Sequence, residues 1–160
     1  ALIPPLQNLA DAIARETFLE QLKDAASKSA AHYMKSQTQN MPSNDFASFK
    51  TFFKEEDYFW SHVLTKKVIE ETETAIEVKI TECLWAETFR SAGAADIGYA
   101  AICHPDFAMY NAFNPNIHLV RTKTLMQGDD AATIAVNGEG ESDSPLLIQL
   151  ILFTEPGIDP

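Results

Sequence analysis

IEVKITEC, residues 76–83, is the best-defined strand of this 160-residue chain. Ile76, Val78 and Ile80 alternate with polar residues, so they share one face and predict a half-buried β-strand. If the alternation continues one step further, Glu82 lies on the same apolar face. Burial of a carboxylate is unfavourable without a partner, and desolvation raises its pKa toward values that suit a general acid or base. Glu82 is therefore the first candidate catalytic residue.

The segments before this strand predict mainly helical support. Apolar residues recur at three- and four-residue intervals over 6–37, which is typical of an amphipathic helix, and a phase change near Arg15 allows two helices instead of one. Asn44 is expected to cap a second helix through Phe46 and Phe53, followed by a helical turn over 55–60. We interpret the aromatic residues of this region as core packing, with a ring-binding wall as the alternative.

Further strands are predicted on both sides of the 76–83 strand, with helices between the later ones. A strand at 62–71 precedes it. Helices at 84–91 and 96–113 follow it, and the second of these is capped by Asp96 and is interrupted or restarted at Pro105. Two strands, 117–126 and 131–136, are joined through a Gly-Asp-Asp turn at 128–130. The predicted fold is α+β: N-terminal helices packed on an antiparallel sheet of about four strands, with a helical segment inserted between strand pairs.

Length and composition predict one domain over residues 1–160. Residues 1–61 form the helical support, 62–136 the sheet and the site-bearing helices, and 137–160 an acidic loop and a terminal segment. The apolar run 146–153 fits either a strand or a buried helical turn. With 46% hydrophobic and 22% charged residues, a mean hydropathy of −0.14 and no apolar run of about 18 residues, a soluble protein is expected.

The net charge and the number of cysteines limit the partners and the compartment that we expect. A formal net charge of −11 argues against nucleic acid, because binding to phosphates requires clustered Lys and Arg. Two cysteines do not make a disulfide framework, and free thiols together with the absence of a signal segment lead us to expect a cytoplasmic protein. We expect a small-molecule substrate, no cofactor and no membrane, and leave the oligomeric state open, with a homodimer among the alternatives.

Cys103 and Asp106 are the candidates for nucleophilic catalysis. They lie three residues apart, so on a continuous helix they share a face, and His104 follows the thiol directly. A thiol becomes a nucleophile when a neighbouring group activates and orients it. The alternative is a buried core cysteine, and the same two interpretations apply to Cys83 beside Glu82.

Arg121, Cys83, His104 and His118 are the candidates for substrate binding. Arg121 is in phase with Ile117 and Leu119, so an inward guanidinium could clamp a substrate carboxylate; a surface ion pair is the alternative. His118 lies on the opposite strand face and is more typical of a structural histidine. Zinc bound by the two cysteines, Asp106 and a histidine is a further alternative, although no ligand spacing supports it and the preferred prediction is no metal.

Four short marks occur in a fixed order in this chain. They are Glu82-Cys83, the Cys-x-x-Asp of Cys103 and Asp106, the aromatic-Asn-Pro turn at 113–115, and Thr-Leu-x-x-Gly-Asp at 124–129. In this order they resemble the L-2-amino-thiazoline-4-carboxylic acid hydrolase-like family, over roughly the second half of the chain. The resemblance implies hydrolytic opening of a C–N bond in a cyclic amidine or amide, with a thiol attacking and a carboxylate moving protons.

Other functions stay open beside this one. They are a cysteine- or carboxylate-dependent cyclase or isomerase acting on a natural-product intermediate, and a non-catalytic small-molecule-binding module. The binding module gains weight from Ala132, which stands where the family pattern has a cysteine. Ala132 is in phase with Ile134 and Val136, so a thiol there would face the interior. Whether the chain lacks it naturally or by deliberate change is open.

The side-chain directions expected for these residues predict that they meet at one place in the fold. Glu82 and Ala132 are expected on the inward face of two strands, and Cys103 and Asp106 on a helix that must cover a sheet face to bury its apolar side. We therefore expect these four residues to line one cavity between helix and sheet, with Arg121 at its rim if the substrate is an acid.

Overall fold

The computed structural model describes residues 4–55 and 60–138. Along the chain the elements are α1 Pro4–Thr38, α2 Phe46–Glu55, β1 Leu64–Glu71, β2 Ala75–Cys83, α4 Leu84–Ser91, α5 Ala95–Gly98, the π-helical turn η1 Tyr99–Cys103, α6 Pro105–Phe113, β3 His118–Val120, the 3-10 turn η2 Leu125–Gln127, and β4 Ala132–Asn137. The expected apolar element at 146–153 and most of the expected turn at 55–60 lie outside the described residues.

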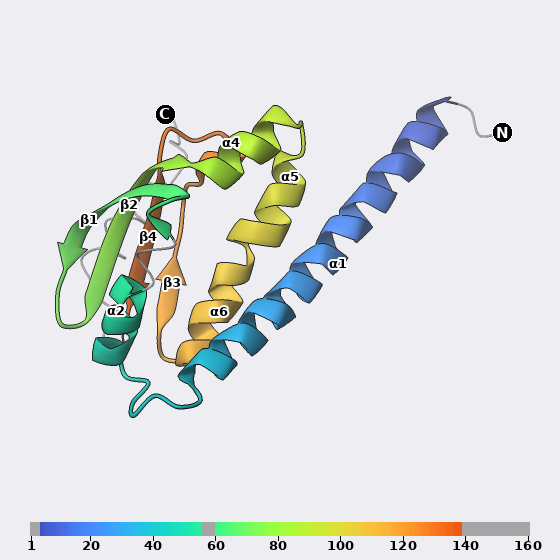
Figure 1. The fold of residues 1–160 in the computed structure, drawn as a ribbon. Coiled ribbons are helices and arrows are strands. Elements are labelled where there is room, and N and C mark those ends of the chain that lie inside the picture. The colour runs from blue at the N-terminus through green and yellow to red at the C-terminus, as the bar shows by residue number, and fades with distance from the viewer. Residues whose placement is uncertain (1–3, 56–59, 139–160) are drawn as a thin grey trace, which may run out of the picture.

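The sheet has the order β1-β2-β4-β3, with every neighbouring pair antiparallel. The helices α4, α5 and α6 are inserted between β2 and β3, so the predicted α+β class and the inserted helical segment are confirmed. In Figure 1 the yellow α5 and α6 run between the sheet and the long blue α1, while α2 stands beside the β1–β2 hairpin. The inserted helices are therefore the layer that contacts the sheet.

The core lies between one sheet face and these helices. Alternation places Ile76, Val78 and Ile80 of β2 and Ala132, Ile134 and Val136 of β4 on that face, and all six are buried. Phe49 of α2 is fully buried, and its ring meets the rings of Tyr110 and Phe113 edge-on at 5.3 Å each. Edge-to-face contacts at this distance are the favoured geometry for buried rings. The expectation that aromatic side chains of the second helix pack in the core is confirmed for Phe49.

α1 is a single 35-residue helix, so the alternative of two helices is wrong. Its later turns pack on α6 through Met34, which is 1% exposed. Its earlier turns extend past the other elements in Figure 1, and Leu9, Ile13 and Phe18 are half exposed, so the apolar pattern there does not mark a buried face. None of the described helices combines the length and apolar character that crossing a membrane requires.

Three predicted boundaries are wrong because side chains cap differently. Asp45, not Asn44, caps α2, since its Oδ1 accepts from Ser48 N at 2.8 Å. Asp96 lies inside α5 and accepts both hydrogen bonds of a forked contact from Arg15. The strand expected at 117–126 ends at Val120, because Thr124 accepts from Gln127 N and starts a 3-10 turn instead.

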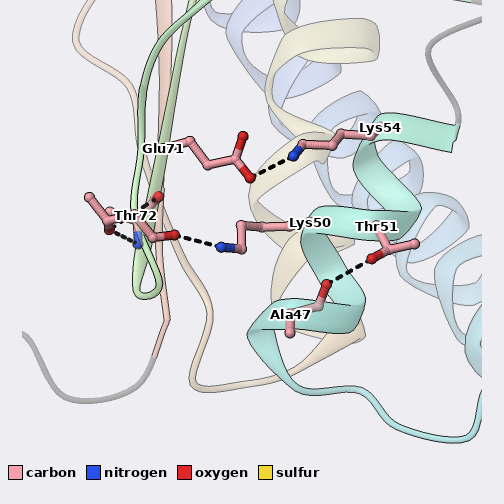
Figure 2. A network of polar contacts seen from close by, with 7 residues as sticks. Ala47, Lys50, Thr51, Lys54, Glu71 and Thr72 are labelled. Carbon is pink, nitrogen blue, oxygen red and sulfur yellow. Dashed lines mark hydrogen bonds and ion pairs between the residues drawn. The ribbon is translucent and has the colours of Figure 1, made fainter.

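Two lysines of α2 hold this helix against the β1–β2 hairpin. Lys54 Nζ lies 2.5 Å from Glu71 Oε1, and Lys50 Nζ donates to the backbone oxygen of Thr72 at 2.5 Å (Figure 2). Both contacts lie near the surface, where such pairs contribute about 1 kcal/mol or less. They fix the position of α2 more than they stabilise the fold.

Gly98 marks a close approach between α5 and its neighbours. A Cβ at this position would lie 2.5 Å from Met126 Sδ and 2.8 Å from Phe89 Cβ. We expect Gly98→Ala to lower the free energy of unfolding by about 1–3 kcal/mol, the usual range for overpacking a core. Urea unfolding measures it, with Gly93→Asn as the control, because Gly93 has a φ of 66° that Asn tolerates and open space around it. Unchanged stability of Gly98→Ala would show that Phe89 and Met126 move aside freely.

Candidate active site

A β-bulge reverses the side-chain phase at the end of β2. Thr65 of β1 faces Glu82, but Lys66 faces Ile80, so Thr81 is an extra residue without a partner in the register. One extra residue exchanges the two faces of everything that follows it. Glu82 consequently points outward, is exposed, and accepts a hydrogen bond from Thr65 Oγ1 at 2.5 Å. The expectation that Glu82 is buried is therefore wrong.

The bulge turns Cys83 inward in place of Glu82. Cys83 is partly buried, and β2 passes from it directly into α4. Its Sγ accepts a hydrogen bond from Ala86 N at 3.4 Å, so the thiol occupies the N-cap position of that helix. Cys83 is thus held at the inner wall by its backbone position and by its capping contact.

Cys103 and Asp106 are placed by an irregular helix. The π-helical turn η1 ends at Cys103, with His104 N donating to Tyr99 O at 2.8 Å, and α6 starts at Pro105. Pro fits the first turn of α6 because an N–H is not needed there. A π-helical turn within a helix is rare and is found frequently at functional sites. Cys103 and Asp106 therefore both belong to the helical layer that packs against the sheet.

Arg121 links these two residues. Its Nη1 donates to the backbone oxygen of Cys103 at 2.7 Å, and its Nη2 donates to Asp106 Oδ2 at 2.5 Å. The Arg121 side chain is 5% exposed and that of Asp106 is 25% exposed. Of the two alternatives for Arg121, the structure shows the inward guanidinium, and it is paired with the Asp106 carboxylate inside the protein instead of lying free at a cavity rim.

A cavity of about 80 Å³ lies at this junction, and we call it the thiol lobe. Its wall contains Cys103, Asp106, Arg121, Cys83 and Ala132 together with mainly apolar residues, namely Trp60, Leu64, Ile80, Trp85, Ile102, Thr124, Leu125, Met126 and Ile134. The structure thus brings together three of the four residues expected to meet. Glu82 instead lines an open depression beside α4, which shares Cys83 and Leu125 with the thiol lobe.

A second cavity of about 70 Å³ adjoins the first, and we call it the phenylalanine lobe. It shares Trp60, Leu64, Ile80, Asp106 and Ile134 with the thiol lobe. Its remaining wall is Phe49, Phe52, Phe53, Lys66, Val78, Met109 and Tyr110. The alternative of a ring-binding wall therefore has a structural basis, since the same phenylalanines both pack in the core and line a cavity.

Burial controls the protonation of the site. It raises the pKa of Cys103 to about 11, while the positive charge of Arg121 acts in the opposite direction. Burial also raises the pKa of Asp106, against the charge and the hydrogen bond of Arg121. Cys103 is consequently a neutral thiol at pH 7, and its activation requires a proton acceptor. Asp106 is the carboxylate on the same wall.

The two histidines lie elsewhere. The ring of His104 packs between those of Tyr99 and Phe107, at 6.2 and 6.1 Å between ring centroids. His118 is exposed on β3, the edge strand of the sheet. Neither lines either lobe, and in the described part of the chain no three Cys, His, Asp or Glu side chains gather as a metal site would require. The expected substrate-binding roles of both histidines therefore gain no support from their positions.

One family model matches residues 1–131, and its description is L-2-amino-thiazoline-4-carboxylic acid hydrolase. The chain belongs to this family. The match to the hydrolase family also covers the first half of the chain, which carries none of the four short marks. It ends one residue before Ala132, so the equivalence of Ala132 to a family cysteine stays a prediction. No curated protein matches the chain.

Three solved structures similar to this hydrolase-family member come from other classes of protein. A trafficking protein particle complex subunit 3 from Naegleria fowleri, covalently bound to palmitic acid, has a TM-score of 0.46 and 13% identity, with 84% of this chain and 90% of that chain covered. The phenol-responsive sensory domain of the transcription activator PoxR has a TM-score of 0.41 and 14% identity, covering 90% and 73% of the two chains. An H-NOX protein from K. algicida has a TM-score of 0.41 and 10% identity, covering 75% and 64%.

Sequence reasoning missed most of the apolar wall. Ile80 and Ile134 share the inward phase of Ala132, so their positions could have been inferred. Trp60 and Trp85 come from segments whose orientation no periodicity reveals. One family mark has a structural explanation, because Asp129 Oδ2 accepts from Thr124 N at 2.8 Å and closes the Thr-Leu-x-x-Gly-Asp turn.

Proposed function

We propose that this protein is a small-molecule hydrolase that opens a C–N bond of a cyclic amidine or amide, with Cys103 as nucleophile. The observation that carries the proposal is the shared wall of one cavity: Cys103 and Asp106 line it together, and Arg121 binds the backbone of one and the carboxylate of the other. Membership in the hydrolase family supports the same reaction class.

The proposed chemistry uses the resident groups in turn. Cys103 Sγ forms a bond to the electrophilic ring carbon while its proton passes to Asp106, whose raised pKa makes it a better acceptor than an ordinary aspartate. The ring C–N bond then breaks as that proton is transferred to the leaving nitrogen. Water attacks the remaining carbon–sulfur intermediate, and the thiol is released. Arg121 keeps the nucleophile and the acceptor in one orientation throughout.

A non-catalytic binding module is the second candidate, and two observations favour it. The pKa of Cys103 is raised to about 11, which opposes formation of a thiolate. Ala132 presents a methyl group to the thiol lobe where the resembled pattern has a second thiol. In this case the lobes would bind a small molecule without changing it.

A ring-opening assay separates the two. The protein is incubated with 2-amino-2-thiazoline, 2-methyl-2-imidazoline and 2-pyrrolidinone, and ring-opened product is measured by mass spectrometry. We expect the unmodified chain to open at least one of them, and Ala132→Cys to raise the rate by about 10²-fold, the lower range for a positioned catalytic group. Ala135→Cys is the matched control, because Ala135 is similarly buried in the same strand but lies on its other face.

The outcomes of this assay are distinct. Product formation by the unmodified chain supports the hydrolase. A gain with Ala132→Cys and none with Ala135→Cys supports the placement of position 132 in the active site. If neither the unmodified chain nor Ala132→Cys opens any ring, the hydrolase proposal is wrong.

A further inference from the structure

β1 is the outermost strand on one side of the sheet in the described part of the chain (Figure 1). Its residues 67–71 are all exposed, and the apolar side chains of Val68 and Ile69 are 45% and 52% exposed. An edge strand offers its backbone N–H and C=O groups to another strand. Lysines and bulges often protect such an edge, so the arrangement of the charges on β1 decides whether a second strand is repelled or attracted.

A second bulge in β1, at Ile69, brings Lys67 and Glu70 to the same face of the sheet. Lys67 faces Lys79 in the register with β2. Glu70 faces Glu77, which leaves Ile69 as the extra residue. Directly opposite residues share a face, and residues 77 and 79 alternate with the buried residues of β2. Lys67 and Glu70 therefore both lie on the outer face, whereas without the bulge they would lie on opposite faces.

Within one chain, this register places like charges directly opposite each other. Lysines face each other at positions 67 and 79, and glutamates at positions 70 and 77. Like charges in this arrangement destabilise an antiparallel pair. In the part of the chain that the structure describes, none of these four side chains forms an ion pair. The pKa of Glu77 is raised by burial and, after it, by the charge of Glu70. Lys67 and Glu70 therefore have no opposite charge directly across from them on the β2 side.

We propose that β1 pairs antiparallel with β1 of a second copy of this chain, so that the two sheets become one. The two-fold axis passes between Val68 and Ile69. Reversal of one copy about this axis puts Lys67 opposite Glu70 of the partner subunit, and Glu70 opposite the partner subunit's Lys67. Both pairs lie on the outer face, because the bulge has given the two residues the same phase. Each like-charge pair of the single chain thereby gains an opposite charge on its other side.

The inner face repeats this complementarity. Lys66 faces Ile80 of β2, and Glu71 faces Ile76. Both isoleucines are buried, so Lys66 and Glu71 share the inner face. The same register puts Lys66 opposite Glu71 of the partner subunit. The Glu71 carboxylate already pairs with Lys54 of α2, and a carboxylate can accept from a second donor.

The partner is a second copy because this strand is its own complement. Residues 66–71 read Lys-Lys-Val-Ile-Glu-Glu, so reversal exchanges every lysine position with a glutamate position. A parallel, in-register arrangement would place lysine beside lysine, and an antiparallel slip by two residues would place Lys67 opposite Val68 or Thr72. Only residues 66–71 of each chain take part, so the interface is small. We expect a dissociation constant of about 10 µM, at the weak end for specific complexes.

Sedimentation velocity of the full chain over a range of concentrations tests the proposal. Lys67→Glu and Glu70→Lys each place like charges opposite each other across the axis, and each should raise the dissociation constant of the dimer at least about tenfold. Lys35→Glu is the matched control, because it changes the net charge as Lys67→Glu does but lies on the exposed side of α1. Both β1 variants create an opposite-charge pair with β2 inside the chain, so the fold should persist, which urea unfolding checks.

Two rescue experiments test the register. In an equal mixture of the Lys67→Glu and Glu70→Lys proteins, every pair across the axis is again of opposite charge, so a heterodimer should form although neither variant dimerises alone. The double variant Lys67→Glu/Glu70→Lys exchanges the two charges and should dimerise with itself at about the unmodified affinity, but not with the unmodified chain.

Three results would overturn the inference. The first is an unmodified chain that stays monomeric well above the expected dissociation constant. The second is a dimer that either single charge reversal weakens no more than Lys35→Glu does, since the interface would then lie on another surface. The third is a dimer that the single reversals weaken but that neither the mixture nor the double variant restores, because the pairing of Lys67 with Glu70 would then be wrong.

Discussion

Replacement of Cys103 by alanine is expected to lower kcat/KM for any ring-opening substrate by about 10³-fold or more, the scale of loss when a covalent nucleophile is removed. The substitution removes only the sulfur from a partly buried position, so the fold should persist. The matched control is Cys83→Ser, which keeps an N-cap acceptor for Ala86 N and tests whether any loss is particular to the thiol at position 103. A Cys103→Ala protein with full turnover would exclude Cys103 as the nucleophile.

The pH dependence of the same thiol gives an independent check. Because burial raises its pKa from 9.0 to about 11, the thiol stays protonated to higher pH, and its thiolate fraction at pH 7 is about 10²-fold below that of an ordinary cysteine. Alkylation of Cys103 by iodoacetamide should therefore be slower by about that factor in the folded protein than in the urea-unfolded chain, with the rate still rising above pH 9. A rate that levels off near pH 9 would contradict the burial of this thiol. Peptide mapping separates Cys103 from Cys83.

Arg121→Met is expected to lower the free energy of unfolding by about 3–5 kcal/mol, the usual loss when one partner of a buried ion pair is removed. The variant leaves the Asp106 carboxylate without its cation and the Cys103 carbonyl without its donor. Lys54→Met is the matched control, because its ion pair with Glu71 is much more exposed and should contribute about 1 kcal/mol or less. Urea unfolding of both variants measures the difference.

A double variant tests the origin of that loss. Arg121→Met combined with Asp106→Leu replaces both charges by apolar groups and should regain much of the stability, because no unpaired charge stays buried. If Arg121→Met has no larger effect than Lys54→Met, the Arg121–Asp106 pair is solvated and the described geometry of the site is wrong. The single variant should also raise the pKa values of Cys103 and Asp106 further, since the charge of Arg121 lowers both.

Local periodicity was sufficient for the regular parts of this molecule. The alternation of β2 placed Ile76, Val78 and Ile80 in the core, and the helix expected at 84–91 has those bounds in the structure. Ala132 was placed inward by the same reasoning. In each case the side-chain phase follows from the residue's own segment, so one sequence contains the necessary information.

The errors lie where another segment determines the phase. The predicted burial of Glu82 is wrong because the bulge at Thr81 exists only in the pairing with β1, and the sequence of β2 alone does not indicate it. For Arg121 the sequence leaves an inward guanidinium and a surface ion pair as alternatives, because its partner Asp106 is fifteen residues away and is brought to it by the packing of α6 against β3. The apolar walls of the two lobes come from α2, α4, α6 and the sheet, so only the assembled fold reveals them.

The π-helical turn makes the site sensitive to chain length as well as to residue type. Each residue of a helix turns the chain by about 100°, so loss of one residue between Tyr99 and Cys103 would restore a regular α-helix and rotate what lies on one side of the turn against what lies on the other. Either the helix before the turn would lose its contacts with α1, or Cys103 and Asp106 would swing away from the sheet. Among relatives that keep this site, we therefore expect a single deletion in the turn to be less compatible with function than substitutions at its positions other than Cys103.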